Sequence, residues 1–257
     1  MLDYASFPEQ RQSELVTRLQ REGKLVCSQL ASELGVSEHT IRRDIVELAN
    51  RGLCKKVYGG AIEISPAQGS ILTRTSNIGH EKQRIAEGAL KLIAPNSTVY
   101  LDSGTTSLAV VQSMPRDMDI TLITNSIPLA HEALSLSKAE VILLGGKVEK
   151  SVGGSVGAEA QEQLRKLYID IGFLGVCAFD TTRGISSFNY DDALFKRLLV
   201  KQCGQLAAPV TGEKYATIAR HHVAEVIDIS DIIVCKDKLS QEQQNALAQT
   251  DITVNYV

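Results

Sequence analysis

The chain has 257 residues, of which 44% are hydrophobic and 22% charged, and its formal net charge is -3. No charged leader precedes an apolar stretch and no apolar run is long enough to span a membrane, so we expect a soluble, cytoplasmic protein with room for two domains and no membrane partner. The five cysteines are far apart and include no CxxC pair, which argues against a disulfide framework and against a zinc site.

The first part of the chain has the pattern of short helices separated by glycine. A helix is predicted between Pro8 and Gly23, because Leu15 and Leu19 fall on one face. A second helix is predicted in "SQLASELG", with Ser28 as the N-cap and a glycine as the terminator. These two helices form the start of a small helical domain.

A third helix is predicted after Ser37, which can act as its N-cap. Its apolar residues fall at i, i+4, i+7 and i+8, so they form one stripe that must be buried: Ile41, Ile45, Leu48 and Ala49. The side chains that this stripe leaves exposed are polar or basic: His39, Thr40, Arg42 and Arg43. Two helices joined by a tight turn, with such a face on the second, are typical of the helix-turn-helix that reads the major groove of DNA.

The segment "LCKKVYGGAIEI" predicts two short strands about a turn, a wing beside the third helix. Lys55, Lys56 and Tyr58 lie on it. Between Arg42 and Tyr58 five basic residues stand against two acidic ones, although the whole chain is slightly acidic. A local basic patch of this kind favours a polyanionic partner.

This stretch resembles the winged helix-turn-helix of the DeoR family of bacterial transcriptional regulators, whose signature reads like "VSxxTIRRDLxxLxxxGLxxRxHGGA". Ile45 replaces the usual Leu, and "KKVYGG" stands where "RxHGG" is common. The resemblance implies a DNA-binding domain over residues 1–62 with these contacts to double-stranded operator DNA: Ser37, His39, Thr40, Arg42, Arg43, Lys55, Lys56 and Tyr58. The matching residues are Val36, Ser37, Thr40, Ile41, Arg42, Arg43, Asp44, Leu48, Gly52, Leu53, Gly59, Gly60 and Ala61.

Residues 63–80 show no sustained period and contain proline, glycine and several hydroxyl residues, so we expect a linker. From residue 81 to 257, short β-branched runs alternate with helical segments. This alternation predicts an α/β domain with a mainly parallel sheet covered by helices on both faces. The expected strands lie in "STVYLDSG", "DITLITNS", "AEVILLGG", "IDIGFLGV", "GQLAAPV" and "DIIVCKD".

Ligands of such sheets bind at the carboxyl ends of the strands, and the residues there are polar and glycine-rich. "LDSGTT" ends a strand at Asp102 and begins a helix near Thr106, which predicts an anion site suited to phosphate at the helix N-terminus. Any one of these residues can also be a helix cap or a turn. No P-loop lysine and no GxGxxG pattern is present, so we expect no nucleotide cofactor, and no residue cluster has metal-ligand spacing. The candidates at these strand ends are Asp102, Ser103, Gly104, Thr105, Thr106, Asn125, Ser126, Gly153 and Lys214.

The second half also resembles the C-terminal sensor domain of the DeoR family, which is similar to ribose-5-phosphate isomerase and glucosamine-6-phosphate deaminase-like folds. The shared motifs are "LDSGTT", "TNS", "LLGG", "FLG" and "GISSFNYDDALFKR". The resemblance implies that the DSGTT loop, Asn125, Ser126 and the helix from Asp191 to Lys196 bind a phosphorylated sugar or polyol. Where the family usually has "ADxSKF" this chain has "APVTGEKYA", so the Asp is absent and Lys214 follows an insertion.

Together the two halves predict a DNA-binding regulator, a repressor of a sugar or polyol operon that a phosphorylated sugar relieves, acting as a homo-oligomer and not as an enzyme. One alternative is a sugar-phosphate isomerase with a DNA-binding extension, in which Asp191 or Asp192 is the general base and Lys214 the electrophile. Another is a nonspecific chromosome-binding protein, which would leave the second domain unexplained.

Overall fold

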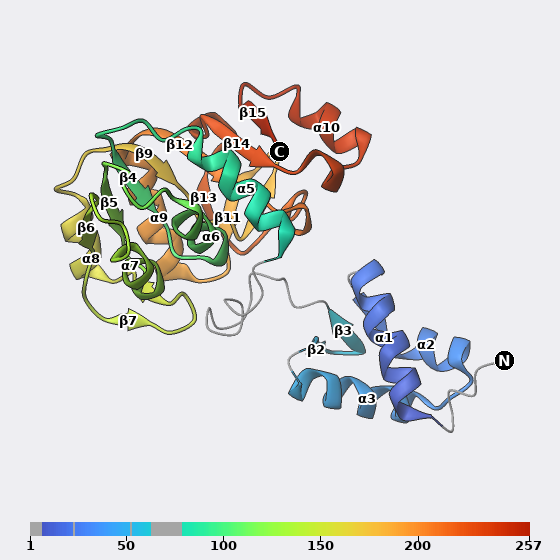
Figure 1. Ribbon diagram of the computed structural model, residues 1–257. Coiled ribbons are helices and arrows are strands. Elements are labelled where there is room, and N and C mark those ends of the chain that lie inside the picture. Colours follow the sequence, from blue (N-terminus) through green and yellow to red (C-terminus); the bar gives the residue numbers. More distant parts are fainter. Residues whose placement is uncertain (1–6, 23, 52, 63–78) are drawn as a thin grey trace. The chain divides into compact units, whose positions relative to one another are not determined.

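The computed structural model describes residues 7–22, 24–51, 53–62 and 79–257. The chain divides into two compact units, residues 1–68 and 69–257 (Figure 1). Most of the expected linker, residues 63–78, lies outside the described residues, and the first helix after it begins at His80. The predicted boundaries at residues 62 and 81 therefore stay predictions.

The described residues of the N-terminal unit form three helices and a three-stranded antiparallel sheet in the order β1-β3-β2. The two wing strands expected from the sequence are β2 and β3, and β1 is an unexpected third strand that pairs with β3. The elements are α1 (Pro8–Glu22), β1 (Lys24–Val26), α2 (Cys27–Leu34), α3 (Glu38–Asn50), β2 (Lys55–Val57) and β3 (Gly60–Ile62).

The core of this unit is the apolar stripe of α3 packed on α1 and α2. Ile41, Ile45 and Leu48 are buried against Leu15 and Leu19, as their spacing predicted. Ala49 is only partly buried.

The start of α2 differs from the expectation. Val26, not Ser28, occupies the N-cap position and makes no side-chain cap. The backbone N–H of Cys27 instead donates to the carbonyl of Gly59 at 2.9 Å, so β-sheet geometry replaces the cap.

Two glycines determine the backbone geometry of the wing. Gly59 has a φ of 79° in the turn between β2 and β3, a conformation that side chains disfavour. Gly60 lies so close to β1 that an added Cβ would be 1.8 Å from the carbonyl oxygen of Leu25. The "GG" of the motif is therefore required once by the turn and once by strand packing.

The C-terminal unit is built on a seven-stranded sheet in the order β15-β14-β12-β9-β4-β5-β6, and every pairing within it is parallel. Six of the strands are those expected from the sequence, and the edge strand β15 is the one that sequence reasoning missed. The strands are β4 (Thr98–Leu101), β5 (Thr121–Thr124), β6 (Glu140–Leu143), β9 (Ile169–Phe173), β12 (Cys203–Pro209), β14 (Asp231–Val234) and β15 (Thr253–Tyr256).

Helices cover both faces of the sheet, as expected, and two separate hydrophobic cores result. On one face α5 and α6 lie side by side, and α7 follows beside α6 (Figure 1). On the other face α8 and α9 pack together. The helices are α5 (His80–Leu90), α6 (Thr105–Ser113), α7 (Ile127–Ala133), α8 (Ala158–Leu164), α9 (Tyr190–Gln202) and α10 (Gln241–Leu247).

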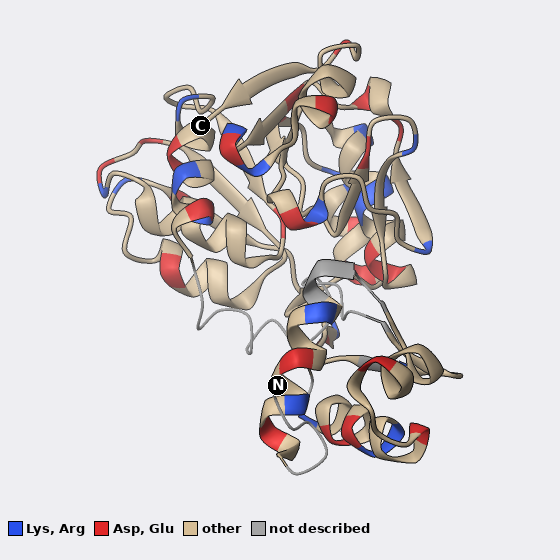
Figure 2. Cartoon of the chain, turned by 90° about the vertical axis from the view of Figure 1, so that its right-hand side faces the viewer, with Lys and Arg blue, Asp and Glu red and all other residues tan. Residues whose placement is uncertain are grey.

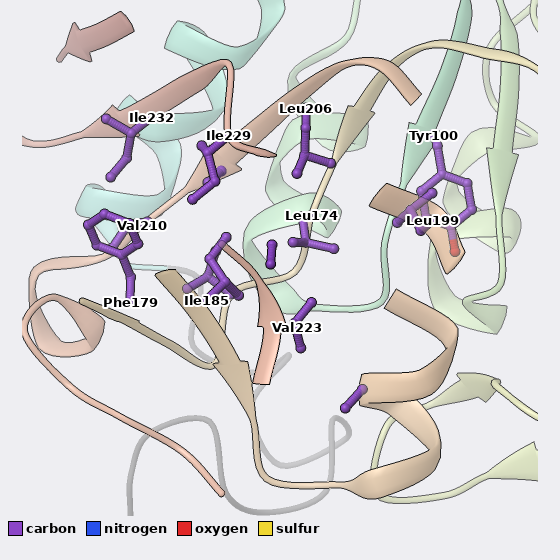
Figure 3. Close-up of a cluster of buried hydrophobic side chains, with 14 of the residues drawn as sticks. Tyr100, Leu174, Phe179, Ile185, Leu199, Leu206, Val210, Val223, Ile229 and Ile232 are labelled. Carbon is purple, nitrogen blue, oxygen red and sulfur yellow. The ribbon is translucent and has the colours of Figure 1, made fainter. Parts of the chain in front are cut away.

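A second small sheet, β10-β11-β13, closes the core on the α9 face. Figure 3 shows Phe179 and Ile185 from this sheet beside Val210 and Ile229 of the main core. A two-stranded hairpin, β7 and β8, follows β6. These strands are β7 (Val148–Glu149), β8 (Gly154–Ser155), β10 (Ala178–Asp180), β11 (Gly184–Ser187) and β13 (His221–Ala224).

Candidate functional site

The first candidate site is the exposed face of α3. Ser37 is its N-cap, and the Ser37 hydroxyl accepts a hydrogen bond from the Thr40 N–H at 3.1 Å. His39, Arg42 and Arg43 are exposed on this helix, with 60% of the Arg42 side chain and 77% of the Arg43 side chain accessible. The sequence period thus placed these residues correctly on the outer face.

Both arginines are held loosely by acids one turn away. Arg42 bonds Glu38 at 2.8 Å, and Arg43 bonds Glu47 at 3.3 Å. Exposed ion pairs of this spacing contribute little to stability, so a phosphate or a base edge can replace the acid at little cost. Figure 2 shows acidic and basic residues interspersed along the helices of this unit.

A groove of about 550 Å³ separates α3 from the turn of the wing. Its polar and basic lining comes from both elements: His39, Arg42 and Arg43 from α3, Lys56 and Tyr58 from the wing. Tyr58 is fully exposed at the tip of the turn. The backbone of Lys55 lies in β2, and its side chain lies outside the described part of the structure.

Sequence reasoning missed the residues that fasten this helix. Asp44, directly after the two arginines, is buried and forms an ion pair with Arg11 of α1. Gln12 donates to Glu47 at 2.7 Å and to Asp44 at 3.3 Å, and Arg51 donates to Gln12 at 3.2 Å. The only signal in the sequence was an acid, Asp44, next to a pair of arginines. This pattern is too common to predict which residue the acid contacts.

The second candidate site lies at the carboxyl end of β4, where α6 begins. The N-cap of α6 is Gly104, so no side chain caps the helix, yet Thr105 and Thr106 in its first turn are buried. The first N–H groups of a helix lack partners within the helix and carry its partial positive charge. A Cβ added at Gly104 would meet no described atom within 4 Å, so open space adjoins this helix end.

Asp102, Lys196 and Asp192 form a buried cluster beside that helix end. The Lys196 ammonium lies 2.8 Å from Asp192 Oδ2 and 3.4 Å from Asp102 Oδ2, and all three side chains are at most 3% exposed. The backbone N–H groups of Ser103 and Gly175 each donate to Asp102 at 2.8 Å. A Cβ on Gly175 would lie 2.7 Å from Asp102 Oδ2, which explains the glycine of the "FLG" motif.

The charges in this cluster are strongly coupled. Burial raises the pKa of Asp102 to about 6, and the nearby Asp192 adds to this rise while Lys196 opposes it. Burial alone would lower the pKa of Lys196, but Asp102 and Asp192 outweigh it and hold that pKa above its ordinary value. The lysine is therefore a cation already neutralised within the protein.

Asn125 and Ser126 follow β5, next to the end of β4, and are fully buried. The Tyr100 hydroxyl donates to Asn125 Oδ1 at 2.9 Å, and Asn125 Nδ2 donates to the Ser155 carbonyl at 3.1 Å. The hairpin of β7 and β8 is fastened here, because Ser155 N–H bonds the Asn125 carbonyl and Gly153 accepts from the N–H of Ile127.

The remaining residues expected at the effector site lie on α9 and after β12. Asp191 is exposed in the first turn of α9, whereas its neighbour Asp192 is buried and contacts Lys196. Lys214 is buried in the turn Gly212–Lys214 after β12. Among the described residues, no group of three or more His, Cys, Asp or Glu could hold a metal ion. No described helix is long and apolar enough to cross a membrane.

A capped helix with an exposed basic face, a preceding helix and a β-wing define the winged helix-turn-helix class of DNA-binding proteins. Here that module is joined to a parallel α/β unit. Residues 11–67 match the family described as the DeoR-like helix-turn-helix domain, and residues 78–236 match the DeoR C-terminal sensor domain. The chain belongs to the DeoR family and is a DNA-binding transcriptional regulator, so the family expected from the sequence is confirmed.

Several curated relatives align over most of the chain. The HTH-type transcriptional regulator GlpR of Haloferax volcanii is 28% identical over 254 residues, which cover 96% of this chain and 97% of the relative. The HTH-type transcriptional regulator GolR of Listeria innocua is 28% identical over 91% of this chain and 93% of its own length. The glycerol-3-phosphate regulon repressor of Escherichia coli K12 is 26% identical over 84% of this chain and 86% of its own length.

Similar solved structures are more distant. Ribose 5-phosphate isomerase A from Methanocaldococcus jannaschii has a TM-score of 0.39 and 14% identity, over 52% of this chain and 53% of that one. Translation initiation factor eIF-2B from Pyrococcus horikoshii has a TM-score of 0.45 and 14% identity, over 86% of this chain and 94% of that one. Nothing about ligand or activity follows from similarities this remote.

Proposed function

We propose that this chain represses a sugar or polyol catabolic operon and leaves its operator when a phosphorylated sugar or polyol binds the C-terminal unit. The observation that carries the effector half is the buried, uncapped N-terminus of α6 beside open space at Gly104. Such a helix end is suited to an anion, and phosphate is the anion that a dense set of N–H groups and hydroxyls binds best. A relative named as a glycerol-3-phosphate regulon repressor supports this direction.

On the DNA side, we assign base reading to the middle of α3. Arg43 and Arg42 have the length and the donors to bond guanine edges, with His39 and Thr40 beside them. Ser37 at the helix start, Lys55 and Lys56 on the wing and Tyr58 at its tip would contact the backbone. The groove between α3 and the wing has room for a phosphate strand next to the helix.

On the effector side, the phosphate would bind the first turn of α6, at Ser103, Gly104, Thr105 and Thr106. We assign Asp102, Asn125, Ser126 and Lys196 to the same site; contacts of Asp102 with Ser103 and Lys196 support this assignment. Gly153, with a φ of 78°, shapes the hairpin next to Ser126. We keep Lys214, in the turn after β12, and Asp191, in the first turn of α9, as further candidates.

The isomerase alternative is less well supported. A general base needs a carboxylate that is free to take a proton from substrate carbon. Asp191 is exposed to solvent at a helix start, and Oδ2 of Asp192 is held by Lys196 and the Ser187 hydroxyl, which leaves only Oδ1 to act as a base. Relatives named as a transcriptional regulator and as a regulon repressor also favour binding without turnover.

The experiment that tests this function has two stages. Genomic binding sites of the full chain are mapped, and the operator obtained is used in a fluorescence anisotropy titration. Sugar and polyol phosphates chosen from the neighbouring genes are then added, each beside its unphosphorylated form as the control. We expect a phosphorylated compound to weaken operator binding. Equal effects of the free sugar, or turnover of the added compound, would contradict the proposal.

A further inference from the structure

Two buried side-chain atoms at the carboxyl edge of the sheet have no hydrogen-bond partner among the described residues. They are Oγ of Ser126 and Oδ1 of Asp192. Their residues are 0% and 2% exposed. Buried polar groups are nearly always paired, so two such atoms at one edge of one sheet require an explanation.

Both residues are linked through polar contacts to the end of β4, just before α6. The Ser126 N–H donates to the Thr124 hydroxyl at 3.1 Å, and that hydroxyl donates to the Leu101 carbonyl at 2.7 Å, one residue before Asp102. This places Ser126 against the end of β4 on the β5 side.

On the α9 side, Asp192 reaches the same loop through Lys196. The Lys196 ammonium joins Asp192 Oδ2 to Asp102 Oδ2, and Asp102 Oδ1 accepts the Ser103 N–H. Ser126 and Asp192 are thus both linked to the end of β4, just before the helix start where an anion would bind.

The chemistry of the two atoms limits what can meet them. Asp192 Oδ2 already accepts from Lys196 and from the Ser187 hydroxyl, so Oδ1 is the free acceptor of an ionised carboxylate. Ser126 Oγ can both accept and donate. The cluster has two carboxylates for one ammonium, so a carboxylate brought against Asp192 Oδ1 would be repelled, whereas the N–H groups at the start of α6 would offset the charge of a phosphate bound there.

We propose, building on the phosphate-sensing function above, that Asp192 Oδ1 and Ser126 Oγ bind hydroxyl groups on the carbon chain of the effector. The effector is then a sugar or polyol phosphate that carries no second anionic group. Phosphorylated sugar acids are rejected, because their carboxylate offers no donor to Asp192 and adds charge to the cluster.

The test compares matched probes on the full chain by isothermal titration calorimetry. Glucitol 6-phosphate and 6-phosphogluconate form one pair, ribitol 5-phosphate and 5-phosphoribonate form a second, and inorganic phosphate is the common reference. In at least one pair, we expect the polyol phosphate, which lacks the carboxylate, to bind about tenfold or more tightly than the phosphorylated acid.

Variants then locate the preference. Asp192→Asn and Ser126→Ala should each weaken binding of the polyol phosphate by about tenfold and leave the affinity for inorganic phosphate unchanged. Asp251→Asn, at an exposed acid outside the proposed site, is the matched control and should change neither affinity. Melting curves of each variant show whether it is folded, and Ser126→Ala keeps the test open if Asp192→Asn is not.

The outcomes separate the two proposals. If acids bind as tightly as the polyols, or if both variants keep the wild-type preference, the hydroxyl assignment is overturned while phosphate sensing stands. If neither inorganic phosphate nor any of the four esters binds, the phosphate site at α6 is wrong, and the hydroxyl assignment is overturned with it.

Discussion

Asp44 and Arg11 form a buried ion pair that fastens the recognition helix α3 to α1. Arg11 Nη2 lies 3.2 Å from Asp44 Oδ1, and the two side chains are only 5% and 4% exposed. Although Asp44 directly follows Arg42 and Arg43 in the sequence, it lies inside the domain. Its role is to hold in place the helix that presents the two arginines.

Asp44→Ala should lower the free energy of unfolding of the N-terminal unit by about 3–5 kcal/mol, because it removes the buried carboxylate that is ion-paired with Arg11. Thermal and urea unfolding of the full chain, followed by circular dichroism, measure this loss. The control is Glu162→Ala, which removes an exposed pair with Arg165 and should cost less than about 1 kcal/mol. An Asp44→Ala loss no larger than that of the control would contradict the account.

Arg43 and Lys56 should contribute to DNA binding in different ways. Arg43→Ala should cost roughly 1–3 kcal/mol on the operator and relax the preference at one base position, because the side chain would read a base edge. Lys56→Ala should weaken all sequences alike and flatten the salt dependence, because it would contact a phosphate. Anisotropy on operator and scrambled DNA at several salt concentrations distinguishes them, with Arg165→Ala as a control outside the DNA-binding unit. Equal losses on both DNAs for both variants would refute the assignment.

The exposure of the arginines could be predicted from the sequence, and the contacts of Asp44 could not. A period of 3.6 residues fixes which side chains of a helix face the core, so burial of Ile41, Ile45 and Leu48 leaves Arg43 outside. Asp44 falls at the border of that stripe. Whether it is exposed depends on Arg11, which lies on another helix and has no local signal.

The effector site shows the same limit. The strand ends and the DSGTT turn follow from local pattern, and they brought Asp102, Asn125 and Ser126 to one edge. Choosing between Asp191 and Asp192 requires the rotation of α9 about its own axis, which depends on its packing against β9, β11 and β12. Two adjacent acids at a helix start look alike in sequence, yet only Asp192 contacts Lys196.

Asp102 should make stability depend on pH. Its pKa rises from the ordinary 3.8 to about 6 on folding, so between these values the folded chain binds more protons than the unfolded chain. Unfolding free energy therefore falls as pH rises through this window, by about 3 kcal/mol in all. Lys196 stays protonated throughout and adds no slope here.

The measurement is the difference in unfolding free energy between wild type and Asp102→Asn, taken from about pH 4 to about pH 7. Since the variant lacks the titrating carboxyl, the wild-type value should decline relative to it as pH rises. Asp191→Asn serves as the control at an exposed acid. If the difference in unfolding free energy between wild type and Asp102→Asn stays constant or grows with pH, folding does not raise the pKa of Asp102.

Self-association is expected, because a single winged helix buries little DNA and specific sites are commonly read as paired half-sites. The C-terminal unit should supply the contacts. Sedimentation velocity at micromolar concentration, with and without operator DNA, measures the assembly. A monomer under both conditions would refute this prediction.

The central claim is that a phosphate ester at the start of α6 controls DNA binding, and one titration tests it most directly. Operator affinity is measured for wild type and Thr105→Glu, with and without the sugar or polyol phosphate identified from the bound genes. A coupling of about 1–3 kcal/mol predicts a wild-type operator affinity that falls roughly 5- to 150-fold on adding the ester. Thr105→Glu puts a carboxylate where the phosphate would bind, so its affinity should no longer respond to the ester. An ester that leaves wild-type affinity unchanged, or one that acts equally on Thr105→Glu, would contradict the claim.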